Sequence, residues 1–160
     1  MADSAKTFMV ENAQIIFRNF EGKESQYNRE GDRNFAVILD HDVAEAMLAD
    51  GWNVRYLKLP EDSEEGDLPT PYIQVSVSFK NRPPRVVLLT ASSRTQLDED
   101  SVAVLDWADI ETADLIARGY DWVVNGKTGT KAYLQSLFVT IREDPLEAKY
   151  AIHENPPSHS

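Results

Sequence analysis

The stretch Tyr72-Ile-Gln-Val-Ser-Val-Ser-Phe79 decides the fold class of this chain. Apolar residues occupy every second position, and uncharged polar residues fill the positions between them. A period of two places all the apolar side chains on one face of a β-strand and the polar ones on the other. We therefore predict a strand with one buried and one polar face, which is typical of antiparallel sheets.

Shorter runs of the same kind lie on both sides of this stretch. The run Lys80-Asn-Arg-Pro-Pro-Arg85 predicts a turn that joins 72–79 to 86–89 as a hairpin, and Asn125-Gly126 predicts a second tight turn. A short helix is predicted over 43–49, closed by Gly51, and a helical segment or a looser turn over 99–105. The remaining strands are predicted over 7–20 (broken near Asn12-Ala13), 33–39, 53–59, 110–117, 120–124 and 131–142.

About seven short strands and one or two short helices predict a mainly β fold, an OB-like antiparallel barrel. A chain of 160 residues favours one domain. We expect a flexible N-terminus over 1–6, an OB-like DNA-binding domain over 7–144 and a partly disordered, proline-rich tail over 145–160. The chain has no cysteine, which excludes disulfides, thiolate metal sites and cysteine nucleophiles. No apolar run is long enough to span a membrane.

The net charge is −11, which by itself opposes a nucleic-acid partner. The distribution of charge along the chain matters more than the net charge, because many of the acidic residues are concentrated in two short segments. Residues 61–67 hold five acidic residues and no base, and three more acids follow at 98–100. The bases gather elsewhere, so a local basic surface is compatible with the overall charge.

Catalytic motifs are hard to find in this sequence. The three histidines, His41, His153 and His159, lie in a predicted helix cap and in the tail, so none is expected to be functional. Gly126-Lys127-Thr128 lacks the upstream glycine and the following helix of a phosphate loop. We therefore predict no enzyme, no catalytic or metal-binding residue and no cofactor. The open alternative is a metal-dependent nuclease that uses the acids between 98 and 114.

Basic and aromatic residues occur together beside the predicted turns. Proteins hold single-stranded nucleic acid in a cationic groove with aromatic platforms. The phosphates contact Lys and Arg side chains, and the nucleobases stack on aromatic rings. We predict phosphate contacts from Arg29, Arg33, Arg82, Arg85, Lys127 and Lys131, and stacking from Tyr27, Tyr120, Trp122 and Tyr133.

Several stretches resemble the single-stranded-DNA-binding proteins of tailed bacteriophages. The resemblance covers about residues 8 to 150, most of the chain, and the following stretches carry it. They are Tyr27-Asn-Arg-Glu-Gly-Asp-Arg-Asn-Phe35, Gly51-Trp-Asn-Val54, Leu97-Asp-Glu-Asp-Ser-Val102 and Asp114-Leu-Ile-Ala-Arg-Gly-Tyr-Asp-Trp-Val-Val-Asn-Gly-Lys-Thr-Gly-Thr-Lys-Ala-Tyr-Leu134.

The resemblance implies an OB-fold core that binds and protects single-stranded DNA during phage replication or recombination, in the host cytoplasm. It implies a homodimer or cooperative assembly, and replication or recombination proteins as partners. The chain ends Pro156-Pro-Ser-His-Ser160, without the acidic tail and terminal aromatic that many single-strand binders use to recruit partners. The other functions left open are a protein-interaction or virion-structural domain and, ranked last, a DNA mimic.

Overall fold

The alternating stretch of the sequence forms a strand near the middle of the sheet. In the computed structural model, which describes residues 6–26, 28–80 and 82–142, strand β5 (Pro71–Val77) buries Ile73, Val75 and Val77 and exposes Gln74. The predicted strand and its predicted faces are therefore confirmed. A second polar position, Ser76, is half-buried on the outer side.

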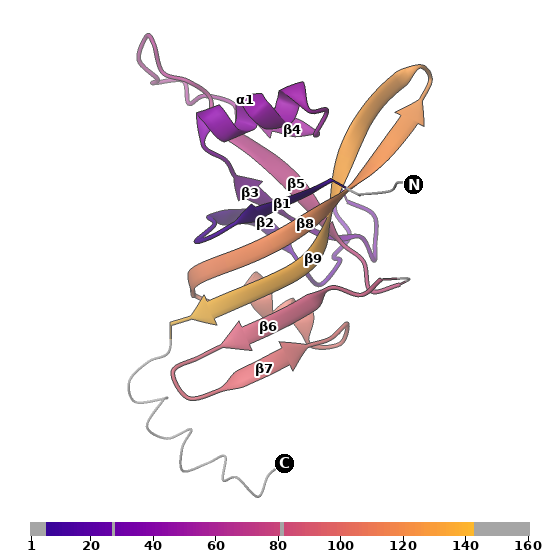
Figure 1. Cartoon of the computed structure of the whole chain (residues 1–160). Helices are drawn as coiled ribbons and strands as arrows, with labels where there is room; N and C mark the ends of the chain where they lie inside the picture. Colours follow the sequence, from indigo (N-terminus) through magenta and orange to yellow (C-terminus); the bar gives the residue numbers. More distant parts are fainter. Residues whose placement is uncertain (1–5, 27, 81, 143–160) are drawn as a thin grey trace, which may run out of the picture.

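Nine strands, one α-helix and one 3₁₀ helix are present among the described residues (Figure 1). The mainly β prediction is confirmed, although the sequence predicted about seven strands and missed β7. The remaining elements are β1 (Thr7–Val10), β2 (Ile15–Asn19), β3 (Arg33–Ile38), α1 (His41–Ala49), β4 (Val54–Tyr56), β6 (Arg85–Leu89), β7 (Arg94–Leu97), η1 (Val102–Asp106), β8 (Ile110–Val124) and β9 (Lys127–Ile141).

The strands form one sheet in the order β1-β8-β9-β5-β3-β2, with β4 on β5, β6 on β9 and β7 on β6. Strand pairing does not close this path into a complete barrel among the described residues. Its two ends, β1 and β2, follow one another in the chain and are separated by a bend at Asn12, whose φ is 51°. At the bend, Ala13 N donates to Ala113 O of β8 (2.7 Å) and Ile38 N of β3 donates to Gln14 O (3.0 Å). The predicted break near Asn12-Ala13 therefore links the two sides of a strongly curved sheet.

The predicted hairpin between 72–79 and 86–89 is wrong. Strand β5 pairs in parallel with β9 at Ala132 and Tyr133, and β6 pairs in parallel with β9 farther along, from Ser136 to Thr140. The segment between β5 and β6 therefore carries the chain along β9, from the part at Ala132 and Tyr133 to the part between Ser136 and Thr140. Strand β6 does not fold back onto β5. These two parallel pairings also correct the expectation of a purely antiparallel sheet.

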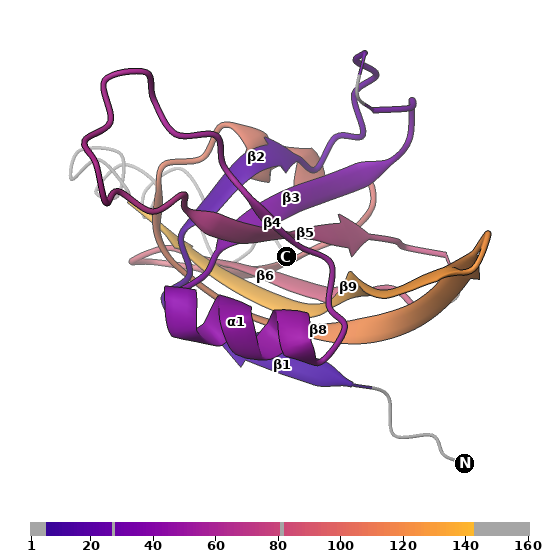
Figure 2. The ribbon, with the colours of Figure 1, turned by 90° about the horizontal axis from the view of Figure 1, so that it is seen from above.

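Strands β8 and β9 form a long two-stranded ribbon that extends beyond the rest of the sheet (Figures 1 and 2). The two strands predicted around Gly119 are one continuous strand, β8. Asn125 and Gly126 take φ values of 51° and 78°, the left-handed geometry of a tight hairpin turn, as predicted. Lys127 and Thr128 begin strand β9, whereas a phosphate loop is followed by a helix. The rejection of a phosphate loop at this position is therefore confirmed.

The two helical elements cover the apolar core from different sides (Figure 2). Helix α1 buries Ala44 and Met47, and η1 buries Val102 and Leu105. The predicted helix over 43–49 is confirmed with an earlier start, whereas the second helical segment is a 3₁₀ turn that begins at Val102. In the described part of the chain no helix has the length and apolar character to span a membrane.

Candidate nucleic-acid interface

Polar and charged side chains form a row across the outer face of four strands. Backbone pairing aligns Asn34 of β3 with Ser76 of β5, Ser76 with Tyr133 of β9, and Tyr133 with Arg118 of β8. Paired residues on adjacent strands point to the same side of a sheet, so the four side chains share one face. Their neighbours Phe35, Val75, Ala132 and Ala117 are buried on the opposite face.

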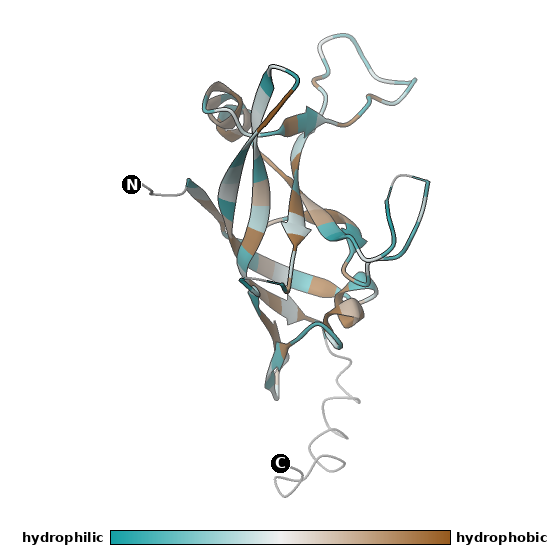
Figure 3. Ribbon diagram, turned by 90° about the vertical axis from the view of Figure 1, so that its right-hand side faces the viewer, coloured by the Kyte–Doolittle hydropathy of each residue, from teal (hydrophilic) through white to brown (hydrophobic). Residues whose placement is uncertain are grey.

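This outer face is hollowed where it meets the loops at its two ends. One hollow of about 640 Å³ lies beside the 20–32 loop, and another of about 360 Å³ lies beside the β8–β9 hairpin. They share Gln74, Ser76 and Lys131, so we treat them as one feature, the strand-face groove. Figure 3 shows the hairpin at the top and the 20–32 loop at the right of this face. The charged residues that line the groove are Glu24, Arg29, Asp32, Arg33, Arg55, Lys80, Glu99 and Lys131.

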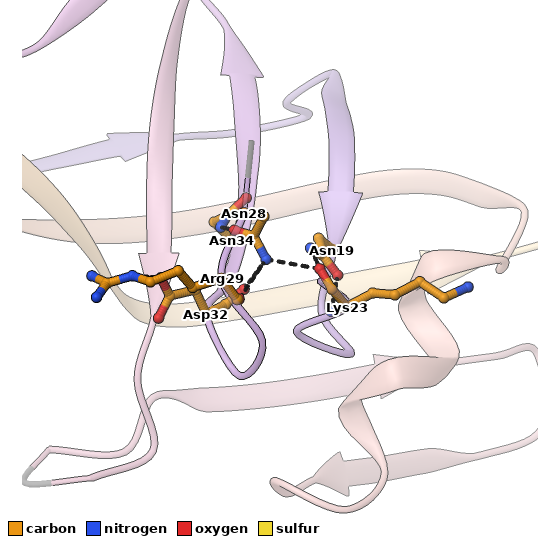
Figure 4. A network of polar contacts seen from close by, with 6 residues as sticks. All are labelled: Asn19, Lys23, Asn28, Arg29, Asp32 and Asn34. Atoms are coloured by element: carbon orange, nitrogen blue, oxygen red, sulfur yellow. Dashed lines mark hydrogen bonds and ion pairs between the residues drawn. The ribbon is translucent and has the colours of Figure 1, made fainter. Parts of the chain in front are cut away.

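The 20–32 loop is organised by Asn28 (Figure 4). Its amide donates to the carbonyl oxygens of Lys23 (2.9 Å), Arg29 (3.0 Å) and Asp32 (3.0 Å). Its own side-chain oxygen accepts from Nδ2 of Asn34 (2.9 Å), which ties the loop to β3. Figure 4 shows the side chains of Lys23 and Arg29 extending away from this centre in different directions. The loop thus presents its charged groups from a fixed backbone.

The positive charges in the groove differ in how they are compensated. Arg29 lies 3.7 Å from Asp32, but its side chain is 92% exposed. By contrast, Lys80, Lys131 and Arg55 have no carboxylate within ion-pair distance among the described residues. Cations without a carboxylate partner are free to contact phosphate oxygens.

Aromatic rings lie beside these cations on β8 and β9. Tyr120 and Tyr133 meet edge to face with centroids 6.2 Å apart, and Nζ of Lys131 lies 5.1 Å from the Tyr133 ring centre. Trp122 borders the hairpin end of the groove and pairs with Gly129, whose missing Cβ leaves room for the indole. The chemistry of this face therefore combines stacking surfaces with phosphate-binding cations.

Five of the ten residues predicted for the site line the groove: Arg29, Arg33, Trp122, Lys131 and Tyr133. Arg33 is largely committed elsewhere, because it donates to Phe20 O (2.9 Å), lies 3.7 Å from Glu99 and is only 18% exposed. Tyr120 contacts Tyr133, and Lys127 is exposed at the hairpin turn. Tyr27 lies outside the described residues, as do His153 and His159. His41 contacts Pro69 O through Nε2 (3.1 Å).

Arg82 and Arg85 lie outside the residues that line the groove. The guanidinium of Arg85 covers the ring of Phe138 at 5.6 Å, and Arg94 covers the same ring at 5.7 Å. The carbonyl of Arg82 accepts a long hydrogen bond from Arg118 (3.5 Å). These arginines extend the positive surface along β9, in the direction of its C-terminal end.

The site predicted from the sequence did not include Arg55, Lys80 and Arg118, which lie on or beside this face. The sequence predicted a polar face for the strand over 72–79, but this face was not assigned to the site. Lys80 continues the same alternation after Gln74, Ser76 and Ser78, so the pattern could have indicated it. Partial burial lowers the pKa of Arg118, and the neighbouring charge of Arg82 lowers it further. An anion placed between these two guanidiniums would relieve that repulsion.

Several of the acids between 98 and 114 have structural roles. Asp106 accepts the backbone N–H groups of Phe20 (2.6 Å) and Glu21 (3.1 Å), Asp109 pairs with Arg142 (3.3 Å), and Asp114 accepts Asn12 N (2.7 Å). The hydroxyl of Ser101 donates to Asp98 and lowers the pKa of that carboxyl. Among the described residues no group of three or more potential ligands could hold a metal ion.

Comparison with known proteins assigns this β-rich chain with a polar strand face to a class of phage DNA-binding domain. Residues 2–156 match the family model described as a putative phage ssDNA-binding domain. The chain belongs to this family, which confirms the resemblance drawn from the sequence. A search of curated protein sequences finds no match.

Two solved structures of the single-stranded DNA-binding protein from bacteriophage Enc34 share the fold. A C-terminal truncation of that protein is 12% identical with a TM-score of 0.54, and the match covers 87% of both chains. Its complex with ssDNA is 10% identical with a TM-score of 0.55, covering 87% of this chain and 88% of the other. At such low identity the likeness concerns the fold alone.

Proposed function

We propose that this protein binds single-stranded DNA, without catalysis and with little sequence preference, through the strand-face groove. The observation that carries the proposal is the continuity of the groove from the 20–32 loop to the β8–β9 hairpin. Lys80 and Lys131 contact phosphates within it, and Arg29 and Arg55 do so at its two ends. Bases stack on Tyr133 and Trp122, while Arg82, Arg85 and Arg118 extend the phosphate track beside β9.

The family and the complex of a similar fold with ssDNA support this ligand. The strong curvature of the sheet, with its ends linked at Ala13, supports an OB-like arrangement in which one face and two loops hold the strand. We further propose that the protein acts in the host cytoplasm during phage replication or recombination, where single strands are exposed.

The first test is a titration of fluorescent oligo-dT at two salt concentrations, with a duplex of equal length as control. We expect tight binding to the single strand, weakened by salt, and little binding to the duplex. The double variant Lys80→Ala/Lys131→Ala should weaken binding and reduce the salt slope by about 1–2 ions, since each phosphate contact on a single strand contributes about 0.7.

The matched control is Lys58→Ala, which removes an exposed lysine that lies outside the groove-lining residues. An unchanged salt slope in the double variant would remove these lysines from the site. Absence of binding by the wild-type protein at low salt would overturn the proposed function.

A further inference from the structure

The end of the β8–β9 hairpin is apolar although it projects into solvent (Figures 1 and 2). Val123 is 72% exposed and Val124 is 57% exposed, and both come directly before the Asn125-Gly126 turn. Among the described residues, strand pairing joins 122–124 only to 127–129. This hairpin tip, residues 122–129, therefore places two valine side chains at the end of a ribbon where they add nothing to the core.

The hairpin is held firmly at the base of its tip. Thr130, which pairs with Asp121, is only 2% exposed. Its backbone N–H donates to Gly51 O (2.8 Å), and its carbonyl accepts from Asn53 N (3.0 Å). Its hydroxyl accepts from Nζ of Lys6 (3.2 Å) and donates to Asp121 (2.8 Å). With a fixed base and a tight two-residue turn, the tip is a stiff projection that can keep its position against a ligand.

The groove side of the ribbon continues to the tip. Side chains alternate between the two sides of a strand, so Val124 lies on the same side as Trp122, and Val123 lies on the other side. Trp122 lines the hairpin end of the strand-face groove, and Lys127, exposed, pairs with Val124. Trp122 and Val124 are about 7 Å apart along β8, which is about two base steps of 3.4 Å. A DNA strand with a base on Trp122 therefore reaches the tip within about two nucleotides.

The charge of the tip suits DNA. Residues 122–129 contain no acidic residue, although 27 of the 160 residues of the chain are acidic. The preceding acid, Asp121, lies on the side of β8 away from Trp122 and is bonded to Thr130. Lys127 is the one charged residue of the tip. An apolar surface beside a cation matches the end of a duplex, which exposes the flat face of its last base pair next to phosphates.

We propose that the hairpin tip acts as a wedge at the junction where a single strand held in the groove enters a duplex. Val124 faces the strand in the groove, Val123 faces the complementary strand, and Lys127 contacts a phosphate at the junction. Apolar side chains unstack base steps in this way in other DNA-binding proteins. The inference rests on the proposed DNA-binding function and adds a class of ligand to it, the single-strand–duplex junction.

The experiment uses a duplex of about 12 base pairs with an oligo-dT tail of about 15 nucleotides, the length of one binding site. One version has the tail at its 5′ end and the other at its 3′ end, because the groove holds the strand in one direction. The tail alone and the duplex alone are the reference ligands. A fluorescent adenine analogue in the terminal base pair, beside the tail, reports unstacking of that pair.

Two variants are compared with wild type. The tip variant is Val123→Ser/Val124→Ser. The control is Leu68→Ser, which removes an apolar side chain of similar exposure (66%) from the loop between β4 and β5. Thermal melts check that both variants fold, as expected for substitutions at exposed positions.

Wild type and the control should bind one tailed duplex at least about fivefold more tightly than the tail alone, an increment at the lower end of what one stacked base contributes. They should also raise the fluorescence of the adenine analogue on that duplex. The tip variant should bind the tailed duplex and the tail alone with equal affinity and leave the fluorescence unchanged. Its affinity for the tail alone should stay within about twofold of wild type, because the single strand in the groove does not need the wedge.

Equal affinity of wild type for the tail and for both tailed duplexes would overturn the inference, as would unchanged fluorescence or a junction preference retained by the tip variant. An equal loss by the tip variant on the tail alone would make the valines ordinary single-strand contacts and would also overturn it. If wild type does not bind the tail alone, the proposed function fails and the inference fails with it. Normal binding to the tail without a junction preference refutes the inference alone.

Discussion

At the scale of single residues, the close approach of Trp122 to Gly129 shapes the hairpin end of the groove. A Cβ built on Gly129 would lie 2.6 Å from Cζ2 of Trp122 and would also meet Oδ1 of Asn53. Because real Cβ atoms do not approach other atoms so closely, the indole is positioned by the absence of a side chain on the opposite strand. Glycine here is required by space and not by backbone conformation.

Gly129→Ala should therefore displace the Trp122 ring. We expect the free energy of unfolding to fall by about 1–3 kcal/mol, the usual range for forced overpacking, and binding to oligo-dT to weaken if the indole stacks on a base. Chemical denaturation and tryptophan fluorescence measure the two effects. Thr128→Ala, at an exposed neighbouring position, is the control. Wild-type emission and wild-type affinity in Gly129→Ala would show that Trp122 does not depend on this glycine.

At the scale of elements, the 20–32 loop shows how a polar segment becomes a defined part of a site. It connects β2 to β3 without regular secondary structure, yet the side chain of Asn28 joins three carbonyl groups of the loop and Asn34 of β3. Ordering the loop before DNA arrives lowers the conformational entropy that binding has to overcome. The exposed side chain of Arg29 is thereby presented from a backbone that these hydrogen bonds hold in place.

Asn28→Ala should loosen this loop without unfolding the sheet. We expect faster amide hydrogen exchange within residues 20–32, a loss of about 1–2 kcal/mol in the free energy of unfolding, and weaker binding to oligo-dT with a nearly unchanged salt slope. Gln26→Ala, which removes an exposed amide from the same loop, is the control for exchange. Unaltered exchange throughout the loop would mean that Asn28 does not organise it.

At the scale of the whole molecule, an acidic protein presents a locally basic surface. The net charge is −11, but Lys80, Lys131, Arg55, Arg82 and Arg118 lie on or beside one face of the sheet. Five of the acids are in the loop between β4 and β5, away from the groove-lining residues. These five acids therefore do not line the surface on which the DNA would lie.

A ligand that binds only the folded state stabilises the whole molecule. Oligo-dT at about 100 times its Kd should add about 2.7 kcal/mol to the free energy of unfolding, which corresponds to a rise in Tm of about 5–10 °C for a chain of this size. Thermal melts with the single strand and with a duplex of equal length measure it. Equal shifts from both would contradict a preference for single strands.

The sequence alone was sufficient for the features that depend on local pattern. Alternation in 72–79 predicted the strand and its faces, Asn125-Gly126 predicted the hairpin turn, and quoted phrases between about 8 and 150 identified the family. Each signal depends on residues close together in the chain, where side-chain period and turn geometry are set by local sterics.

Only the tertiary structure decided which strands are partners and therefore where the groove lies. Strands β5 and β6 both pair in parallel with β9, so the predicted hairpin does not form: Lys80 lines the groove, and Arg85 lies beside β9 outside the groove-lining residues. Period-two patterns look alike for every half-buried strand, so they contain no information on which strand lies beside which. That choice depends on packing between residues more than fifty positions apart, as in the pairing of Val75 with Ala132 and of Val86 with Leu137.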